Sequence, residues 1–499
     1  MFTDDVRHQV WDQVQSHPVR AFARFLTPDT LAGAARSCGR RLSSCPLNLA
    51  HLVWLGLSLA IDQTQSFASV LTVTFKLLID ADLLPQADPA PKPKRGAKRR
   101  RSGRPKGAKR SPRQPAVPRR SKHDPHCADL TKVSEEAFVK ARARMPLQYW
   151  IALVMLLADR FARHHEDRIR WKRFRLLAMD GTLLNLPRYQ ALRDHYGTAR
   201  SGKGGTIPQA RLVMLQFPLA RIPYRFAVAP KSQAEKVMAA TLLAHLRPDD
   251  LLLMDRGFWS YGLFSQIQQR GAFFATRKIE QVHLKLIRRL GPKDTLVRLV
   301  PTDKRWKKTG WPESLELRRI DYQVQGFRPS ALITNVTDPK LITRQEWVGM
   351  ATHKAGEVLN KSIYHRRWKI ETTFSELKVR QGLSKLKGRT PGTIDYEIAS
   401  HVLLYLMVRW LMVEAAEAHG LDPSRLSFTE ALREVRTMIL SLVTSSPRHV
   451  RKVLIPRLLA RLAEHVVPER DGRHYPRPND TKTRDLGHGR KQKPSKLVA

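Results

Sequence analysis

The feature that most constrains the fold is a change in the spacing of apolar residues along the middle of the chain. From 133 to 165 apolar residues recur at helical spacing, whereas 173–180 is a short apolar run that closes with Asp180 and a glycine. Strand-like runs follow at 210–217, 224–229, 251–254 and 272–276, with helical patterns at 232–246 and 261–270. The segment predicts the order strand, strand, strand, helix, strand, helix, strand. Asp180 is expected near the end of the first strand and Asp255 directly after the fourth.

This order is that of a ribonuclease-H-like core, an α/β fold in which a mixed sheet is flanked by helices and the first and fourth strands bring their carboxylates together. Ser134 and Ser232 are expected to cap the helices that they open. Between 278 and 338 the helical spacing disappears, and short alternating runs separated by Gly, Pro and charged residues predict a β-rich insertion. Helical patterns return after 344 and continue to 462, with interruptions at Pro447 and Pro456.

The catalytic core is therefore predicted in two parts, 131–277 and 341–420, separated by the insertion at 278–340. A helical N-terminal domain at 1–85 and a basic linker at 86–130 precede it, while a helical region at 421–466 and a basic tail at 467–499 follow it. The linker and the tail are rich in proline and basic residues, so we expect both to be disordered in the free protein.

The charge balance indicates a polyanionic partner. The chain holds 89 Lys and Arg against 44 Asp and Glu, a formal charge of +45, and nucleic acid is the first candidate. A ribosomal protein of this charge is usually much smaller, and no basic amphipathic helix beside a lipidation signal suggests a membrane surface. No membrane partner is expected, because polar residues interrupt the apolar runs at 47–61 and 402–412, which we interpret as buried helices.

Cysteine usage fits a reducing compartment. Only three cysteines are present, and the N-terminus has no signal-peptide pattern, so a cytoplasmic protein is expected. Zinc binding is a disfavoured alternative, since the spacing of its candidate ligands matches no standard pattern; these are Cys38, Cys45, Cys127, His123 and His126.

Part of the basic linker resembles a DNA-binding motif. The sequence Arg-Ser-Gly-Arg-Pro-Lys-Gly at 101–107 is similar to an AT-hook, in which an extended Gly-Arg-Pro core places its arginine, here Arg104, in an A·T-rich minor groove. The hook normally has arginine where Ser102 stands. A linker that binds phosphate without sequence preference is at least as well supported.

One predicted helix, 364–378, carries a core face beside a reactive face. At about 100° per residue, four residues fall within an arc of roughly 60° and form the polar face: Tyr364, Arg367, Glu371 and Lys378. A neighbouring arc is apolar and consists of Ile363, Ile370, Phe374 and Leu377. Glu376 lies roughly 140° around the helix from Glu371, so we expect it to be a solvated partner of nearby cations, on the outer face that it shares with His365.

Three carboxylates on separate elements suit phosphodiester chemistry: Asp180, Asp255 and Glu371. Such chemistry needs charge stabilisation on the attacking and the leaving oxygens, which two Mg²⁺ ions supply, and Mn²⁺ is expected to be tolerated. Asp180 would contact both ions, and the other two acids would each contact one. Taken singly, an Asp followed by Gly at a strand end is also an ordinary turn.

The three motifs together resemble one family. Asp180-Gly-Thr, Asp255-Arg-Gly-Phe and the spacing Tyr364-x2-Arg367-x3-Glu371-x6-Lys378 are similar to the DDE transposases of bacterial insertion sequences, specifically the insertion-sequence-four family, over 133–389.

This resemblance implies an enzyme that binds the terminal inverted repeats of its element in double-stranded DNA, cuts them in a synaptic dimer and joins them to a target. It implies that the three acids are metal ligands and that Tyr364, Arg367 and Lys378 contact phosphates of the transposon end. The domain at 1–85 is similar in placement to the family's end-binding domain, and the setting would be the bacterial cytoplasm at the nucleoid.

The resemblance also makes Trp306 and Trp311 of the insertion candidates for stacking a flipped base, although either could be a packed aromatic. Further basic residues are candidate DNA contacts or ordinary surface residues: Lys203, Arg211, Arg256, Arg277 and Lys278. Arg256 is favoured because it directly follows Asp255. The alternative functions are a ribonuclease-H-like DNA nuclease that only cuts, and a domesticated DNA-binding protein without catalysis.

Overall fold

The computed structural model describes residues 22, 24–40, 47–61, 133–199, 207–301, 310–323, 329–349, 362–444 and 447–468. The chain divides into two compact units, the first formed by Met1–His245 with Lys369–Val467 and the second by Leu246–Trp368 with Pro468–Ala499. Each unit is considered by itself below. The linker at 86–130 and the tail from 469 onward lie outside the described residues.

The first unit contains an antiparallel sheet. Its long strands are β2 (Phe174–Asn185), β4 (Ile207–Phe217) and β5 (Ile222–Pro230), and the two-residue strands β1 (Arg170–Trp171) and β3 (Thr198–Ala199) pair with β2 and β4. The prediction that Asp180 stands near a strand end is wrong. Pairing with β4 continues from Asp180 opposite Met214 to Asn185 opposite Gln209, so the strand runs on past the acid.

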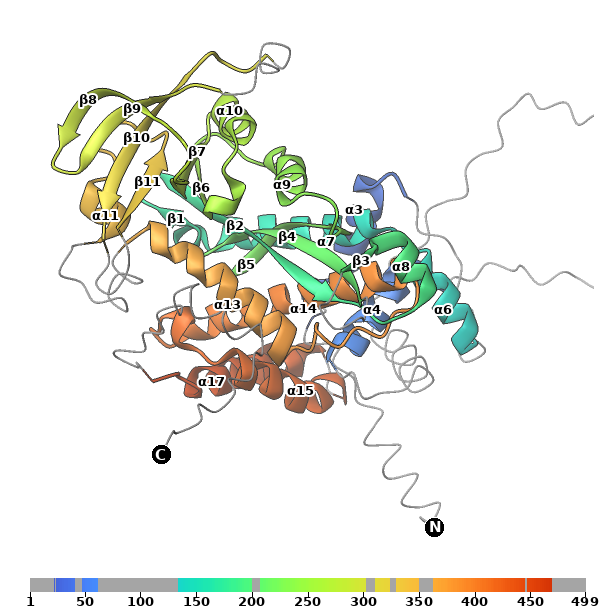
Figure 1. Ribbon diagram of the computed structural model, residues 1–499. Helices are drawn as coiled ribbons and strands as arrows, with labels where there is room; N and C mark the ends of the chain where they lie inside the picture. Colours follow the sequence, from blue (N-terminus) through green and yellow to red (C-terminus); the bar gives the residue numbers. More distant parts are fainter. Residues whose placement is uncertain are drawn as a thin grey trace, which may run out of the picture. The chain divides into compact units, whose positions relative to one another are not determined.

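Helices cover this sheet. The helices α7 (Leu147–His164) and α14 (Pro391–Ala418) pack against β5 and against each other, with α6 (Glu135–Ala143) also on α14 (Figure 1). The predicted cap of α6 is confirmed, because the Ser134 hydroxyl accepts from the Ala137 amide at 3.1 Å. The predicted cap at Ser232 is wrong. Residues 230–233 form a turn, and α9 (Glu235–Leu243) begins only after it.

The helix α14 forms the centre of the core. Residues predicted to be buried there are buried, namely Val402, Leu403, Leu406, Leu411 and Met412. Among the described helices, α14 alone combines the length and mean hydropathy of a membrane span, and 94% of the window that meets this test is buried inside the protein. Arg409 is also fully buried, and its guanidinium donates to the Ala220 carbonyl at 3.1 and 3.3 Å.

The described N-terminal helices belong to the same unit. The helix α3 (Pro28–Ser37) packs on α7, and α4 (Leu49–Ile61) packs on α14. A further short helix, α8 (Gln190–Tyr196), lies against β4.

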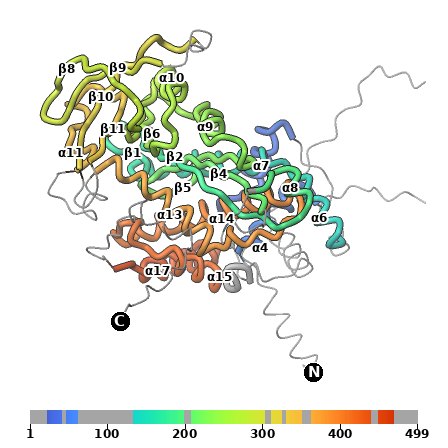
Figure 2. Tube along the Cα trace, viewed as in Figure 1, coloured from blue at the N-terminus to red at the C-terminus, as the bar shows by residue number. Residues whose placement is uncertain are grey.

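The C-terminal helices continue along α14 (Figure 2). They are α15 (Phe428–Thr444), α16 (Pro447–His449), a π-helical turn at Val450–Leu454, and α17 (Ile455–Glu464). The interruption predicted at Pro447 is present, because this residue opens α16. The interruption predicted at Pro456 is wrong: the backbone stays helical from the π-helical turn into α17, with Leu454 and Ile455 both in the right-handed helical conformation.

The second unit contains the remaining strands in the order β6-β7-β11-β10-β9-β8. The strands β6 (Asp250–Met254) and β7 (Phe273–Arg277) are parallel and are joined through α10 (Tyr261–Gln269). The antiparallel remainder consists of β8 (Lys285–Gly291), β9 (Asp294–Leu299), β10 (Leu315–Tyr322) and β11 (Ser330–Thr334), followed by α11 (Arg344–Val348). The sequence did not predict β8, because its residues are largely exposed and show no alternation.

The fold class is thus confirmed: strands in mixed orientation are flanked by helices, and the predicted succession of three strands, helix, strand, helix and strand is present along the chain. The additions are two very short strands and α8.

Candidate active site

Asp180 lies in the middle of β2, where its side chain is half-buried. Its Oδ1 accepts from the Gly181 amide at 2.9 Å. A Cβ at position 181 would meet the side chain of Glu235, whose carboxylate stands 3.2 Å from Arg211 Nη1. Because that side chain is flexible and can turn aside, the contact does not by itself require glycine here.

Glu371 and Lys378 belong to the same unit as Asp180. Glu371 is exposed on α13 (Lys369–Ser375), a helix that packs against β2. Lys378 Nζ donates to the hydroxyl of Thr182, two residues beyond Asp180, and burial lowers the pKa of this lysine. The sequence contained the Asp-Gly-Thr motif but no signal that its threonine would hold Lys378.

The predicted single helix at 364–378 has three kinds of turn. Residues Tyr364–Trp368 form a 3-10 helix, α13 follows, and Glu376–Arg380 form a π-helical turn. The predicted apolar arc is buried, as expected, at Ile363, Ile370, Phe374 and Leu377. The rotation per residue in 3-10 and π turns differs from that of an α-helix. A uniform step of about 100° therefore does not predict the directions in which the polar side chains of this segment point.

Two predictions on the outer face of this helix are wrong. Glu376 is not solvated, because its carboxylate accepts from Arg221 Nη1 at 2.8 Å and from the Tyr405 hydroxyl at 2.6 Å, with 14% of its side chain exposed. His365 is buried in the second unit, 2.5 Å from the Ser362 hydroxyl, and burial lowers its pKa to about 3. Distant residues bind Glu376, and the ring of the distant Tyr322 lies 5.8 Å from that of His365.

Asp255 follows β6 in the second unit. Arg277 Nη2 stands 3.0 Å and Arg367 Nη2 3.8 Å from its Oδ1. Burial opposes ionisation of Asp255, but the charges of Arg367 and Arg277 outweigh it and hold the pKa of this carboxyl below its ordinary value. The Tyr364 hydroxyl donates to the carbonyl of Met254, directly before the acid, at 3.2 Å. Both Tyr364 and Arg367 therefore position the second acid.

The family signature is thus divided between the units. Its Tyr-Arg half surrounds Asp255, whereas its Glu-Lys half lies with the strand of Asp180. Sequence reasoning grouped Arg277 with the DNA-path residues and missed its bond to Asp255. The available signal was its place at the end of the strand parallel to β6.

Trp311 lies half-buried against α10. Its ring occupies the space that a Cβ on Gly262 would need, and it stands 6.1 Å from the ring of Tyr261. In this arrangement it is a packed aromatic. Arg256 is exposed in the 3-10 turn Arg256–Phe258. Several candidates lie outside the described residues: Trp306, Arg104, Lys203, Cys45, Cys127, His123 and His126.

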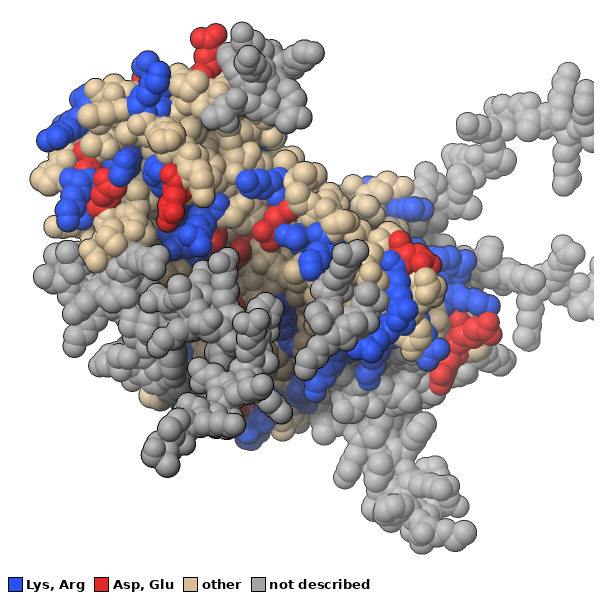
Figure 3. Space-filling view, in the orientation of Figure 1, with Lys and Arg blue, Asp and Glu red and all other residues tan. Residues whose placement is uncertain are grey.

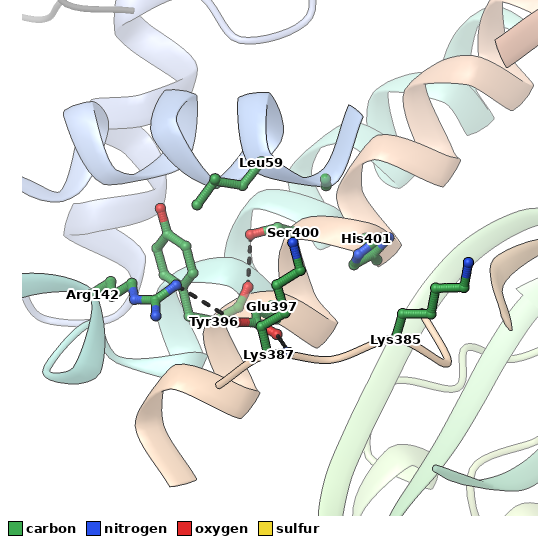
Figure 4. Close-up of a pocket in the computed structure, with 10 residues that line it drawn as sticks. Leu59, Arg142, Lys385, Lys387, Tyr396, Glu397, Ser400 and His401 are labelled. Atoms are coloured by element: carbon green, nitrogen blue, oxygen red, sulfur yellow. Dashed lines mark hydrogen bonds and ion pairs between the residues drawn. The ribbon is translucent and has the colours of Figure 1, made fainter. Parts of the chain in front are cut away.

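A small cavity of about 50 Å³ lies elsewhere in the first unit, between α4 and α14. It is lined by polar side chains that include Arg142, Glu397 and Ser400 (Figure 4). Arg142 Nη1 stands 3.5 Å from Glu397, and the Tyr396 hydroxyl donates to the Leu52 carbonyl at 2.5 Å. The volume suits a few water molecules. The hydrogen bond from Tyr396 to Leu52 joins α14 to α4.

The acids have the donor chemistry of a hard divalent cation, since carboxylate oxygens are the ligands that Mg²⁺ and Mn²⁺ prefer. Asp180 is half-buried, Glu371 is exposed, and Asp255 is held ionised. Within the described part of the chain, no group of three or more His, Cys, Asp or Glu side chains is arranged to hold a metal ion.

Comparison with known proteins identifies the family. Residues 171–407 match the family described as "Transposase DDE domain". "Transposase InsG for insertion sequence element IS4" of Escherichia coli (strain K12) is 26% identical over 357 residues, which cover 69% of this chain and 76% of that protein. The chain is a DDE transposase similar to those of the insertion-sequence-four family. The predicted family is therefore confirmed, and a divalent metal is the cofactor class that such transposases generally use.

Other relatives match this transposase over shorter stretches. "Transposase for insertion sequence element IS231E" of Bacillus thuringiensis subsp. finitimus is 29% identical over 105 residues, 21% of each chain. A cryo-EM structure of a piggyBac transposase synaptic complex with hairpin DNA (SNHP) covers 59% of this chain and 57% of its own, at 11% identity and a TM-score of 0.35. That likeness is too low to bear on the structure of this transposase.

Proposed function

We propose that this DNA transposase binds the terminal inverted repeats of an insertion sequence and carries out cut-and-paste cleavage and strand transfer. The observation that carries the proposal is the placement of the signature: its Glu-Lys half lies with the strand of Asp180, and its Tyr-Arg half surrounds Asp255. Arg367 and Glu371 are four residues apart in one continuous segment, which supports a shared site for the three acids.

In this proposal Asp180, Asp255 and Glu371 hold two Mg²⁺ ions, with Mn²⁺ tolerated. When bound, such ions stabilise charge on the attacking and leaving oxygens of a phosphodiester displacement. Arg277 and Arg367 keep the carboxyl of Asp255 ionised, so that it is available as an oxygen ligand. Asp180 is half-buried on a strand paired to β4, which limits the positions that its carboxylate can adopt.

Three further residues of the signature are proposed to act on the phosphates of the transposon end. Lys378 is held by the hydroxyl of Thr182, close in sequence to Asp180, which would fix its ammonium group for a phosphate. Tyr364 and Arg367 are each only 3% exposed, so their observed contacts support a role in positioning Asp255. Their contact with phosphate stays a prediction.

The partners follow from the same proposal. They are the double-stranded DNA of the transposon ends and target, and a second copy of this chain in a synaptic homodimer. The segment 1–85 is proposed as the end-binding domain, and the linker with Arg104 as an additional DNA contact. The proposed setting is the bacterial cytoplasm at the nucleoid. Stacking of a flipped base on Trp306 or Trp311 also remains a proposal. The comparisons give no support to a simple nuclease or a non-catalytic descendant.

The test uses the full chain with duplex DNA that carries the terminal repeats flanking its gene. Mg²⁺ should give cleavage at the repeat and strand transfer, and chelation by EDTA should stop both. Glu371→Gln should abolish cleavage while repeat binding is retained, whereas Glu464→Gln, which alters an exposed glutamate of the same unit, should cleave normally. Normal cleavage by Glu371→Gln would overturn the assignment of this acid. Nicking without strand transfer by the unaltered protein would favour a nuclease.

A further inference from the structure

A hollow of about 830 Å³ opens at one end of the sheet in the second unit. Since β6 and β7 are parallel, their carboxyl ends meet there, and the antiparallel pairing brings the start of β11, the end of β10 and the start of β9 to the same edge. Arg256 and Gly257, which directly follow Asp255, line the hollow. It therefore begins beside the second acid of the proposed active site.

The walls of the hollow are predominantly basic. Five cationic residues line it, against two acidic ones, Glu280 and Asp321. The cations are Arg256, Arg277, Lys278, Lys293 and Arg319. On the face that Figure 3 shows, Lys and Arg side chains also lie over the strands of this unit.

Two of these cations are neutralised by neighbours and three are not. Arg277 pairs with Asp255 at 3.0 Å, and Arg319 pairs with Asp321 at 2.9 Å. Within the described residues, no ion pair involves the other three, which are Arg256, Lys278 and Lys293. Burial and the charge of Arg319 lower the pKa of Lys278 against the opposing charges of Glu280 and Asp321. Among the described residues its ammonium donates to the main-chain carbonyls of Ile279 and Glu280, at 3.0 and 3.3 Å. An anion in the hollow would relieve this accumulation of positive charge.

The main chain fixes the positions of both lysines. The Lys278 amide donates to the Ala331 carbonyl at 2.8 Å, and the Lys293 carbonyl accepts from the Asp321 amide at 2.9 Å. Lys293 has a φ of 61° in the turn between β8 and β9 and follows Pro292, and a proline before a residue of positive φ is the pattern of a type II turn. Each lysine therefore extends from an ordered strand end.

The row of cations has the length of a short DNA segment. From β6 to β9 the sheet crosses four strand intervals, or about 19 Å at about 4.8 Å per interval. One strand of duplex DNA carries a phosphate about every 3.4 Å along the axis, so this distance corresponds to about five phosphates. Most of the side chains that line the hollow are charged or polar, which suits a hydrated, charged chain.

We propose that this hollow binds the phosphodiester backbone of the DNA strand that passes Asp255, through Arg256, Lys278 and Lys293. The inference rests on the proposed function, because it assigns the hollow to the DNA on which the proposed site acts. The contacts are independent of base sequence, since cations on phosphate carry no sequence information.

The test measures DNA binding without cleavage, in full-length protein carrying Glu371→Gln. Lys278→Gln with Lys293→Gln should weaken binding of a repeat-end duplex and lower the slope of log K against log salt by about 1.8, because each phosphate contact contributes about 0.9. The control is Lys340→Gln, which removes an exposed cation beyond the opposite end of β11 and should leave the slope unchanged. A single-stranded oligonucleotide, tested in parallel, shows whether the bound backbone is that of the duplex or of an unpaired flank.

Gly257 offers a second and independent test. A Cβ there meets no atom within 4 Å, so Gly257→Asp adds a carboxylate to the hollow with little steric cost, and Gly257→Ala is its neutral control. The aspartate should weaken DNA binding and the alanine should not. An unchanged salt slope in the double lysine variant, or equal binding by both Gly257 variants, would overturn the inference. These results are distinct from failure of the proposed function, which would appear as no Mg²⁺-dependent cleavage by the unaltered protein.

Discussion

Two glutamates five residues apart should respond in opposite ways to substitution. Glu376→Ala should destabilise the fold of the first unit, whereas Glu371→Ala should leave stability almost unchanged and abolish cleavage. The contrast arises because Glu376 is the acid beside two buried guanidinium groups, those of Arg221 and Arg409, while Glu371 is exposed on α13.

The magnitude follows from the burial of these cations. Arg221 is 4% exposed and Arg409 is fully buried, and burial together with the charge of Arg221 lowers the pKa of Arg409 to about 10. Removing one partner of a buried ion pair costs about 3–5 kcal/mol because the other charge remains uncompensated. Tyr405 also loses the closer of the two acceptors of its hydroxyl and keeps Thr373 Oγ1 at 3.2 Å. An exposed substitution such as Glu371→Ala changes stability by about 0.5 kcal/mol or less.

The assay pairs urea unfolding with cleavage of a repeat-end duplex, for both variants and the unaltered protein. Glu376→Ala should lose about 3–5 kcal/mol of unfolding free energy. Glu376→Gln, which retains an acceptor for Tyr405, should lose less. Equal stability of Glu376→Ala and the unaltered protein would refute the argument from buried charge. A folded Glu376→Ala protein without cleavage, beside an active Glu371→Ala protein, would show that the acids had been assigned the wrong way round.

Three further predictions follow from the same contacts. Arg277→Ala should raise the pKa of folded Asp255 toward its ordinary value of about 3.9, so the stability that its ionisation provides above that pH should shrink, and less stability should be lost on acidification below it. Gly181→Ala should change stability by about 0.5 kcal/mol or less, because the added Cβ meets only the flexible side chain of Glu235, which can turn aside. His401, whose pKa burial lowers to about 3, stays neutral in the folded protein while the unfolded chain protonates below about pH 6.5. Between pH 6 and 4 this difference should cost the protein about 1.4 kcal/mol of unfolding free energy per pH unit. His401→Gln should abolish that part of the pH dependence.

Unfolding free energies measured across pH 3–8 test all three. An identical acid profile after Arg277→Ala would show that the guanidinium does not hold the charge of Asp255. A large loss of stability in Gly181→Ala would show that the Glu235 side chain cannot move aside. A profile unaltered by His401→Gln would mean that this imidazole takes up its proton equally in both states.

The sequence by itself indicated the candidate site residues, and it determined the order of the elements. Asp180, Asp255 and Glu371 stand in short motifs whose residue types and spacing are local properties of the chain. The apolar arc at Ile370 and Phe374 was equally predictable, because the periodicity of burial follows directly from helical geometry.

Only the tertiary structure decided which partner each of these side chains meets. Glu376 meets Arg221 across 155 residues, and Lys378 meets Thr182 across 196, so local spacing contains no information on either contact. Strand pairing likewise placed Asp180 inside β2. Hydrogen bonds and ion pairs between distant segments depend on how elements pack, and packing is a property of the whole fold.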